Sequence, residues 1–301
     1  MIKRFGNYWM TPNELRAAIL GVKRWNRGDE RAPNKPLMMA YALAQYIQGH
    51  GQMFSYEDEV DRDVHLLLKR FGPSRKAYHP EYPFWRLFND GIWRLDNAEE
   101  CIPRSSNTDA KKSELIKHQV TGGFSDEIYQ LLQSDTQLAI ELLETILSES
   151  FPESIVPEIT AQLGLEFTFK QVQKRDPNFR REVLNAYNGK CAICGFDARI
   201  NDDLFALEAA HIKWKQFNGP CDVNNGLALC SIHHKALDKG AITITPDLHV
   251  KVASTVNGGG IVESLIWDYD KKQINLPRKS EQYPSPQYFR WHDGNVFRDQ
   301  I

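Results

Sequence analysis

Apolar residues recur at helical spacing through most of the first 150 positions. The segment Thr11-Pro12-Asn13-Glu14 has a capping residue, a proline at the first helical position and a glutamate three residues after the cap. This combination predicts a helix that runs to about Trp25. Further helices are predicted over residues 36–49, 55–72, 126–133 and 136–148. The first half of the chain is therefore predicted to be mostly helical.

The pattern changes in the second half of the chain. The run FALEAAHIKW (205–214) alternates apolar and polar residues, which predicts a strand, and NGPCDVNNGLAL (218–229) predicts a loop that returns to a second strand. A chain of 301 residues is long enough for two domains, each with its own core. We predict an α+β protein with a helical domain at 1–150, a linker at 151–175 and a second domain at 176–301.

Composition restricts the class of protein. Hydrophobic residues make up 42% and charged residues 25% of the chain, and no apolar run approaches the roughly 18 residues of a membrane helix. The first residues lack the apolar region of a signal peptide, so we expect a cytoplasmic protein without disulfides. The 5 cysteines are an odd number, and their pattern favours a metal over crosslinks.

Charge is distributed in blocks along the chain. The net charge of −2 hides eight basic residues against three acidic ones in 1–35, and nine acidic residues with no Lys or Arg in 126–166. Such blocks are commonly solvated helix faces. Separate basic regions are also typical of a two-domain protein that binds DNA.

The strongest indication of a functional site in the sequence is two pairs of potential zinc ligands. Cys191 and Cys194 are separated by two residues, as are Cys230 and His233, and 35 residues lie between the pairs. This spacing predicts a closed tetrahedral zinc site, which contributes to folding and performs no chemistry. Buried thiols in an apolar core would not explain why both pairs have the same gap.

His234 directly follows the last predicted zinc ligand. Neighbouring side chains on a helix point about 100° apart, so His233 and His234 are expected to serve different sites. A strand, a loop, a strand and a helix joined by zinc would bring His211, Asn225 and His234 close together. These residues, framed by the zinc ligands, resemble the HNH nucleases with their ββα-metal fold, over about residues 176–248.

The resemblance implies a role for each residue. His211 would be the general base that activates water, Asn225 would orient the His211 ring, and His234 would bind a catalytic divalent ion, Mg²⁺ or Mn²⁺. Many HNH enzymes carry an acid or a histidine directly before the base, where this chain has Ala210. Glu208 lies on the same strand face as Ala210 and is the candidate second ligand. Asp238, one turn after His234, is an alternative ligand or a structural cap.

The segment 72–95, GPSRKAYHPEYPFWRLFNDGIWRL, has four basic residues and six aromatic residues in 24 positions. It is interpreted either as a loop that closes over the helical core or as a recognition loop. In the second interpretation, Tyr82-Pro83 forms a rigid apolar surface. The phosphates are then bound by Arg75, Lys76 and Arg86.

The first half of the chain also resembles a known domain. The segments NKPLMMAYAL, FGPSRKAYHPEYPFWRL and NDGIW look like the sulfur-recognition domain of McrA-type restriction enzymes that cut phosphorothioated DNA, over about residues 10–100. The resemblance implies a sulfur pocket around Tyr82 and Pro83, beside Asn34 and Lys35. Asn34 departs from a histidine often seen in that family, and Arg86 stands where a small residue can occur.

These resemblances predict a restriction endonuclease that recognises phosphorothioate-modified double-stranded DNA with a helical reader and cuts it with an HNH domain. A polarizable, weakly hydrated sulfur suits an apolar pocket, while flanking basic residues bind ordinary phosphates. Two alternatives stay open: an HNH nuclease that reads a modified base such as methylcytosine, and a non-catalytic zinc DNA-binding module. A homodimer is also left open.

Overall fold

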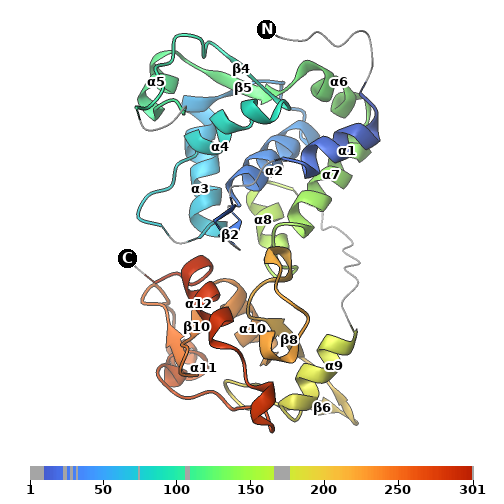
Figure 1. Cartoon of the computed structure of the whole chain (residues 1–301), viewed down its shortest axis with the longest axis vertical. Coiled ribbons are helices and arrows are strands. Elements are labelled where there is room, and N and C mark those ends of the chain that lie inside the picture. Colours follow the sequence, from blue (N-terminus) through green and yellow to red (C-terminus); the bar gives the residue numbers. More distant parts are fainter. Residues whose placement is uncertain are drawn as a thin grey trace.

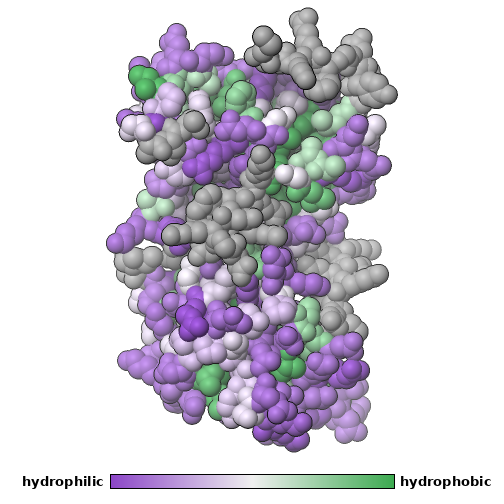
Figure 2. Space-filling view, in the orientation of Figure 1, coloured by the Kyte–Doolittle hydropathy of each residue, from purple (hydrophilic) through white to green (hydrophobic). Residues whose placement is uncertain are grey.

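The computed structural model describes residues 10–22, 26–27, 30–31, 33–73, 75–105, 109–165 and 177–299. Figure 1 shows two lobes, an N-terminal lobe that ends with α8 and a C-terminal lobe that starts with α9. On the face shown in Figure 2, hydrophilic residues cover most of both lobes and hydrophobic residues are scattered. No helix among the described residues is long and apolar enough to cross a membrane.

Eight α-helices lie in the described part of the N-terminal lobe: α1 (Pro12–Leu20), α2 (Asn34–Ile47), α3 (Asp61–Phe71), α4 (Glu81–Arg86), α5 (Lys112–Lys117), α6 (Asp126–Ser134), α7 (Thr136–Ser148) and α8 (Val156–Gln162). The central helix is α2, whose buried residues lie on nearly all its sides. Such a helix belongs inside a helical bundle, and Figure 1 shows α2 enclosed by its neighbours.

A small antiparallel sheet covers one end of this bundle. Its order is β3 (Phe54–Ser55), β5 (Thr121–Phe124), β4 (Trp93–Asp96), with Phe54 opposite Gly122 and Trp93 opposite Phe124. A Cβ on Gly122 would lie 2.8 Å from the Phe84 ring. The glycine therefore lets α4 pack closely on the sheet. The two short strands β1 (Asn26–Arg27) and β2 (Glu30–Arg31) pair separately.

The described C-terminal lobe contains four α-helices and six strands: α9 (Pro177–Ala186), β6 (Arg199–Ile200), β7 (Asp203–Leu204), β8 (Leu207–His211), β9 (Gly226–Cys230), α10 (Ser231–Asp238), β10 (Ile242–Ile244), β11 (Val250–Val252), α11 (Gly260–Leu265) and α12 (Pro286–Asn295). The antiparallel pair β8 and β9 sets Leu207 opposite Cys230 and His211 opposite Gly226. Since α10 follows β9 directly, the two strands and the helix form one continuous ββα unit.

The predicted helices agree with the structure in position and differ at their ends. The segment 136–148 is helical over the predicted range, whereas α1 stops at Leu20 and Trp25 lies outside the described residues. The segment 72–95, interpreted as a loop, contains α4. The predicted linker 151–175 contains α8, which packs in the N-terminal core through Val156 and Ile159. The domain boundaries themselves stay a prediction.

The lobes meet through polar and apolar contacts. The Arg298 guanidinium donates to the carbonyl oxygens of Lys69 (2.8 Å), Gly72 (3.2 Å) and Lys239 (2.9 Å), and so joins the lobes through backbone atoms. Aromatic rings of the C-terminal lobe also belong to the N-terminal hydrophobic cluster: Trp214, Phe217 and Trp291. The contact between the lobes is therefore extended and partly apolar.

Candidate metal centre, catalytic cleft and DNA-reading surface

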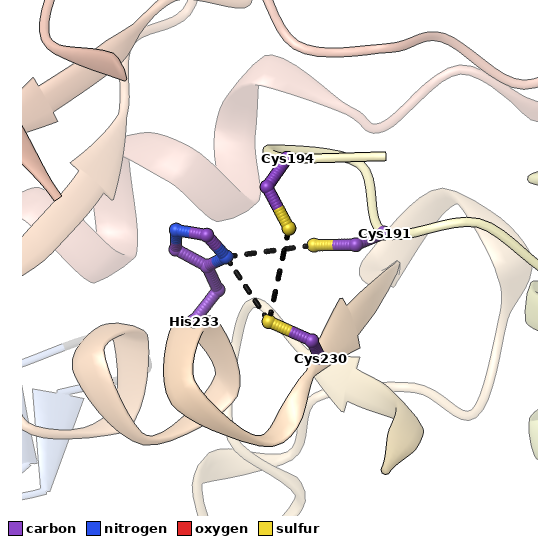
Figure 3. Close-up of side chains that lie close together, drawn as sticks. All are labelled: Cys191, Cys194, Cys230 and His233. Carbon is purple, nitrogen blue, oxygen red and sulfur yellow. Dashed lines mark hydrogen bonds between the residues drawn. The ribbon is translucent and has the colours of Figure 1, made fainter. Parts of the chain in front are cut away.

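The four predicted zinc ligands lie together. Cys191, Cys194, Cys230 and His233 offer ligand atoms that all lie within 4.8 Å of one another, and Figure 3 shows them pointing at a common centre. The His233 Nδ1 atom is 3.2 Å from Cys230 Sγ and 3.6 Å from Cys191 Sγ. A tetrahedral zinc with bonds of about 2.0–2.3 Å has ligand separations of about 3.5–3.8 Å. The cluster therefore fits zinc.

Local structure prepares this cluster for a metal. Gly195 has a φ of 75°, which places it in the left-handed region that glycine favours, and it closes the first knuckle. The Nε2 atom of His233 lies 2.9 Å from the Leu265 carbonyl oxygen, which fixes the tautomer with Nδ1 free for the metal. Hydrogen bonds from Cys194 and Cys230 hold the pKa of Cys191 far below its usual range. A thiolate is the form that binds zinc.

A second cluster lies on the other side of α10. Glu208 and His211 of β8 and His234 of α10 line one cleft with a volume of about 390 Å³. Glu208 Oε2 is 2.6 Å from His234 Nδ1, and Asp238 Oδ2 is 3.3 Å from His234 Nε2. The strand and the helix therefore bring the two predicted ligands of the catalytic ion into contact.

The two carboxylates change the charge of His234. Burial alone would lower the pKa of His234, but the negative charges and hydrogen bonds of Asp238 and Glu208 outweigh it and raise the pKa to about 10. The site thus favours a positive charge, either a proton on His234 or a bound metal ion. A carboxylate and an imidazole in contact, open to a cleft, are a donor set that fits a divalent ion.

The His211 ring is held by stacking. Phe179 of α9 lies parallel to it, with ring centroids 3.9 Å apart and an interplanar angle of 16°. Cys221 Sγ lies 3.5 Å from His211 Nε2. Because the ring also lines the cleft, its position suits a general base whose orientation is fixed by packing.

Asn225 lies beneath this site and is fully buried. Its side chain accepts from the Lys213 backbone N–H (2.8 Å) and donates to the carbonyl oxygens of Lys213 and Pro220 (both 2.9 Å). These bonds close the loop that follows His211 and carries Cys221. The structure thus connects Asn225 to His211 through the loop backbone, whereas the sequence-based expectation was that Asn225 orients the ring.

The predicted sulfur pocket centres on Tyr82 of α4. The guanidinium carbons of Arg86 and Arg104 lie 4.8 Å and 5.1 Å from the Tyr82 ring centroid, and the His79 ring stacks on it at 4.9 Å. Arg86 also makes a bidentate ion pair with the buried Asp109. Tyr82 is therefore a half-buried aromatic surface surrounded by cationic groups.

The other predicted reader residues differ in accessibility. Lys35 and Asn34 are half-buried at the start of α2, and Lys35 Nζ lies 2.5 Å from Asp90 Oδ2. Pro83 is buried, so the apolar surface predicted for Tyr82-Pro83 is presented mainly by the tyrosine. The predicted phosphate contacts Arg75 and Lys76 are exposed.

Several site residues were not found from the sequence. Arg104 and Asp109 lie beyond the segment that was singled out, and no local pattern connects them to Tyr82. Phe179 lies 32 residues before His211, and an aromatic residue in an amphipathic helix carries no signal of stacking on a histidine. These contacts depend on tertiary packing.

Two family models match the chain. Residues 12–168 match the ScoMcrA-like, DNA sulfur-binding domain, and residues 191–245 match an HNH endonuclease model. A comparison with curated proteins returns no match.

Solved structures give weaker similarities. One is the sulfur binding domain of ScoMcrA complexed with phosphorothioated DNA (20% identity, TM-score 0.43, covering 50% of this chain and 94% of that one). A second is the sulfur binding domain of SprMcrA complexed with phosphorothioated DNA (19%, 0.43, 52% and 95%). A third is the Type IV phosphorothioation-dependent restriction endonuclease ScoMcrA (18%, 0.41, 52% and 36%). Because these TM-scores are below 0.5, the conclusions below rest on the family models.

Proposed function

Because the chain belongs to the family of ScoMcrA-like DNA sulfur-binding domains and carries an HNH endonuclease domain, we propose that it cuts DNA that contains a backbone phosphorothioate. The family, the α+β fold class and the endonuclease class predicted from the sequence are confirmed by these matches. The proposal concerns the substrate, the cleavage chemistry and the residues that perform each step.

The chemistry takes place in the cleft between β8 and α10. Glu208 and His234 would hold a divalent ion, either Mg²⁺ or Mn²⁺, and that ion would supply stabilisation of negative charge on the scissile phosphate. His211 accepts a proton from the attacking water, and Phe179 keeps the His211 ring oriented during that transfer. Asn225 holds the loop after His211 and so keeps the base in place.

Zinc has a separate role in this proposal. Its four ligands are close together, and three of them are buried, so water has no open position at the ion. Zinc therefore stabilises the ββα unit, and the ion held by Glu208 and His234 supports the reaction.

Sulfur recognition is assigned to the surface around Tyr82. Sulfur is larger, more polarizable and less strongly hydrated than oxygen, so an aromatic face that excludes water favours it. Arg86 and Arg104 supply positive charge beside that face, and each is partly neutralised by a buried carboxylate, Asp109 for Arg86 and Glu81 for Arg104. The predicted DNA contacts also include Asn34, Lys35, Arg75 and Lys76. Pro83, the buried neighbour of Tyr82 in α4, supports the tyrosine.

One observation carries the proposal: a match to a DNA sulfur-binding family and a cleft lined by His211, Glu208 and His234 occur in the same chain. The partner is double-stranded DNA. The homodimer and the cytoplasmic location stay predictions from the sequence.

The test is cleavage and binding of matched duplexes with and without one phosphorothioate, with Mg²⁺ or Mn²⁺ present. The wild-type chain should cut the modified duplex and bind it more tightly. Tyr82→Ala should lose most of this preference, by about tenfold or more, because stacking and desolvation at an aromatic surface are lost. Weak binding to unmodified DNA should change little, since it comes from Lys and Arg contacts and falls with salt.

Tyr82→Phe is the matched control, because it keeps the aromatic surface and should keep the preference. If wild type cuts both duplexes equally, sulfur recognition is wrong and recognition of a modified base becomes the leading alternative. If no duplex is cut with either ion, the chain is a non-catalytic zinc DNA-binding protein.

A further inference from the structure

The His234 imidazole has a carboxylate at each ring nitrogen. Nδ1 faces Glu208 and Nε2 faces Asp238, at 2.6 Å and 3.3 Å. A metal-binding histidine uses one ring nitrogen for the ion, and the N–H on the other nitrogen usually donates to a carboxylate or carbonyl that fixes the ring. Glu208 is half-buried at the cleft, whereas Asp238 is only 4% exposed. Both carboxylates line the cleft, so the difference in burial places Asp238 as the fixing group and the more exposed Glu208 as the ligand.

Asp238 is itself held by a residue of the other lobe. The Ser154 hydroxyl donates a hydrogen bond to Asp238 Oδ2, the oxygen that also faces His234. Ser154 lies 84 residues earlier in the chain, within the region that matches the DNA sulfur-binding family. A continuous set of hydrogen bonds thus runs from the N-terminal lobe through Asp238 to His234.

The segment around Ser154 is seated against the catalytic helix by independent contacts. Glu158 makes ion pairs with Lys235 within α10 (3.6 Å) and with Lys239 directly after it (2.7 Å). The Gln216 amide donates to the Phe151 carbonyl oxygen at 2.9 Å. Ser154 and its neighbours Pro152, Glu153 and Pro157 also line the cleft that contains His211. The N-terminal lobe therefore forms one wall of the catalytic cleft.

We propose that Ser154 and Asp238 are positioning residues for His234, and that the affinity of the cleft for its divalent ion depends on this contact between the lobes. The inference rests on the proposed function, in which Glu208 and His234 hold the ion. Asp238 would accept the Nε2 proton of His234, which leaves Nδ1, on the side of Glu208, as the nitrogen that would bind the ion. Ser154 fixes the Asp238 carboxylate, so the ring orientation is set by both lobes.

The experiment measures binding of Mn²⁺ to the full-length, zinc-loaded chain by the paramagnetic resonance signal of the free ion. Asp238→Asn should raise the Kd for Mn²⁺ by about tenfold, because it removes the carboxylate that hydrogen-bonds to a metal-binding histidine. Ser154→Ala should raise it by about threefold, the effect of one hydrogen bond. The Mn²⁺ concentration that gives half-maximal DNA cleavage should shift by the same factors.

Two controls separate positioning from general damage. Ser148→Ala removes a half-buried hydroxyl that donates to the Thr145 carbonyl in the same stretch of chain, and it should bind Mn²⁺ as wild type does. Ser154→Thr keeps a hydroxyl at the contact and should restore most of the affinity lost in Ser154→Ala. Equal loss in the Ser148 and Ser154 variants would overturn the proposal.

Other outcomes distinguish this inference from the proposed function. If His234→Ala abolishes Mn²⁺ binding while Ser154→Ala and Asp238→Asn bind as wild type does, the positioning role is wrong and the proposed function stands. If Asp238→Asn abolishes binding completely, as His234→Ala does, Asp238 is a direct ligand and the positioning role is also wrong. If His234→Ala binds Mn²⁺ as wild type does, the proposed function itself fails.

Discussion

The two neighbouring histidines of α10 have opposite environments. His233 is 2% exposed and points at three sulfur atoms that close around it, whereas the His234 side chain is 18% exposed and lines a cleft between carboxylates. The same residue type thus lies in a closed cluster of soft ligands and in an open cleft of hard ligands, and a rotation of about 100° along the helix separates the two. Under the proposed function, the surroundings and not the imidazole itself decide between a structural and a catalytic use.

The largest effect is expected at the closed site. Cys230→Ser should unfold the C-terminal lobe, because binding of structural zinc contributes about 10 kcal/mol or more to folding. Thermal unfolding and elemental analysis are the measurements, and wild type should hold one zinc per chain after dialysis against a mild chelator. A soluble variant with an unchanged melting curve would contradict the closed zinc site.

A large effect of another kind is expected at the open site. His211→Ala should lower the rate of DNA cleavage by about 10²–10⁴-fold, because the base acts in the chemical step. Folding and DNA binding should be retained, since His211 is not one of the four residues of the zinc cluster. Cleavage at the wild-type rate would show that the general base lies elsewhere.

The smallest effect is expected at His292 of α12, which contacts α10, the helix that carries both His233 and His234. His292 is fully buried and bonded to Thr243 and the Leu237 carbonyl oxygen, and burial lowers its pKa from 6.5 to about 4. Between pH 6.5 and 4, His292 is therefore protonated in the unfolded chain but stays neutral in the folded chain. Stability is full above pH 6.5 and falls by up to about 3 kcal/mol toward pH 4.

His292→Gln, which is neutral at every pH, should give a flatter dependence of the unfolding free energy on pH over this window. The measurement is denaturant unfolding at several pH values for both proteins. Parallel pH profiles would mean that another group, such as a zinc thiolate, accounts for the acid sensitivity.

The closed site could be predicted from the sequence because its ligands lie in two short pairs. The gap of two residues in each pair fixes the local turn, and the ββα unit between the pairs has clear periodicity. Glu208 was expected as a second ligand because the resemblance to HNH enzymes calls for an acid near the base and Glu208 shares a strand face with Ala210, and the structure places it beside His234. In both cases short-range geometry determines which side chains meet.

The reader surface and the lobe contact could not be predicted in the same way. The helix α4 has only six residues and contains Pro83, so its sequence is typical of a loop. The ion pair of Arg86 with Asp109 and the bond of Ser154 with Asp238 join residues 23 and 84 positions apart. No periodic pattern relates residues at such separations, because their contact is decided by packing of whole elements.

The Arg298 clamp has a consequence for protein engineering. Its three hydrogen bonds end on backbone carbonyls of residues 69, 72 and 239, so none of them depends on a side chain at those positions. Position 72 still requires glycine, because a Cβ there would lie 2.5 Å from the Leu68 carbonyl oxygen. A chimera that joins this nuclease to another reader would therefore need to reproduce the path of the loop after α3, including the glycine with which that loop begins.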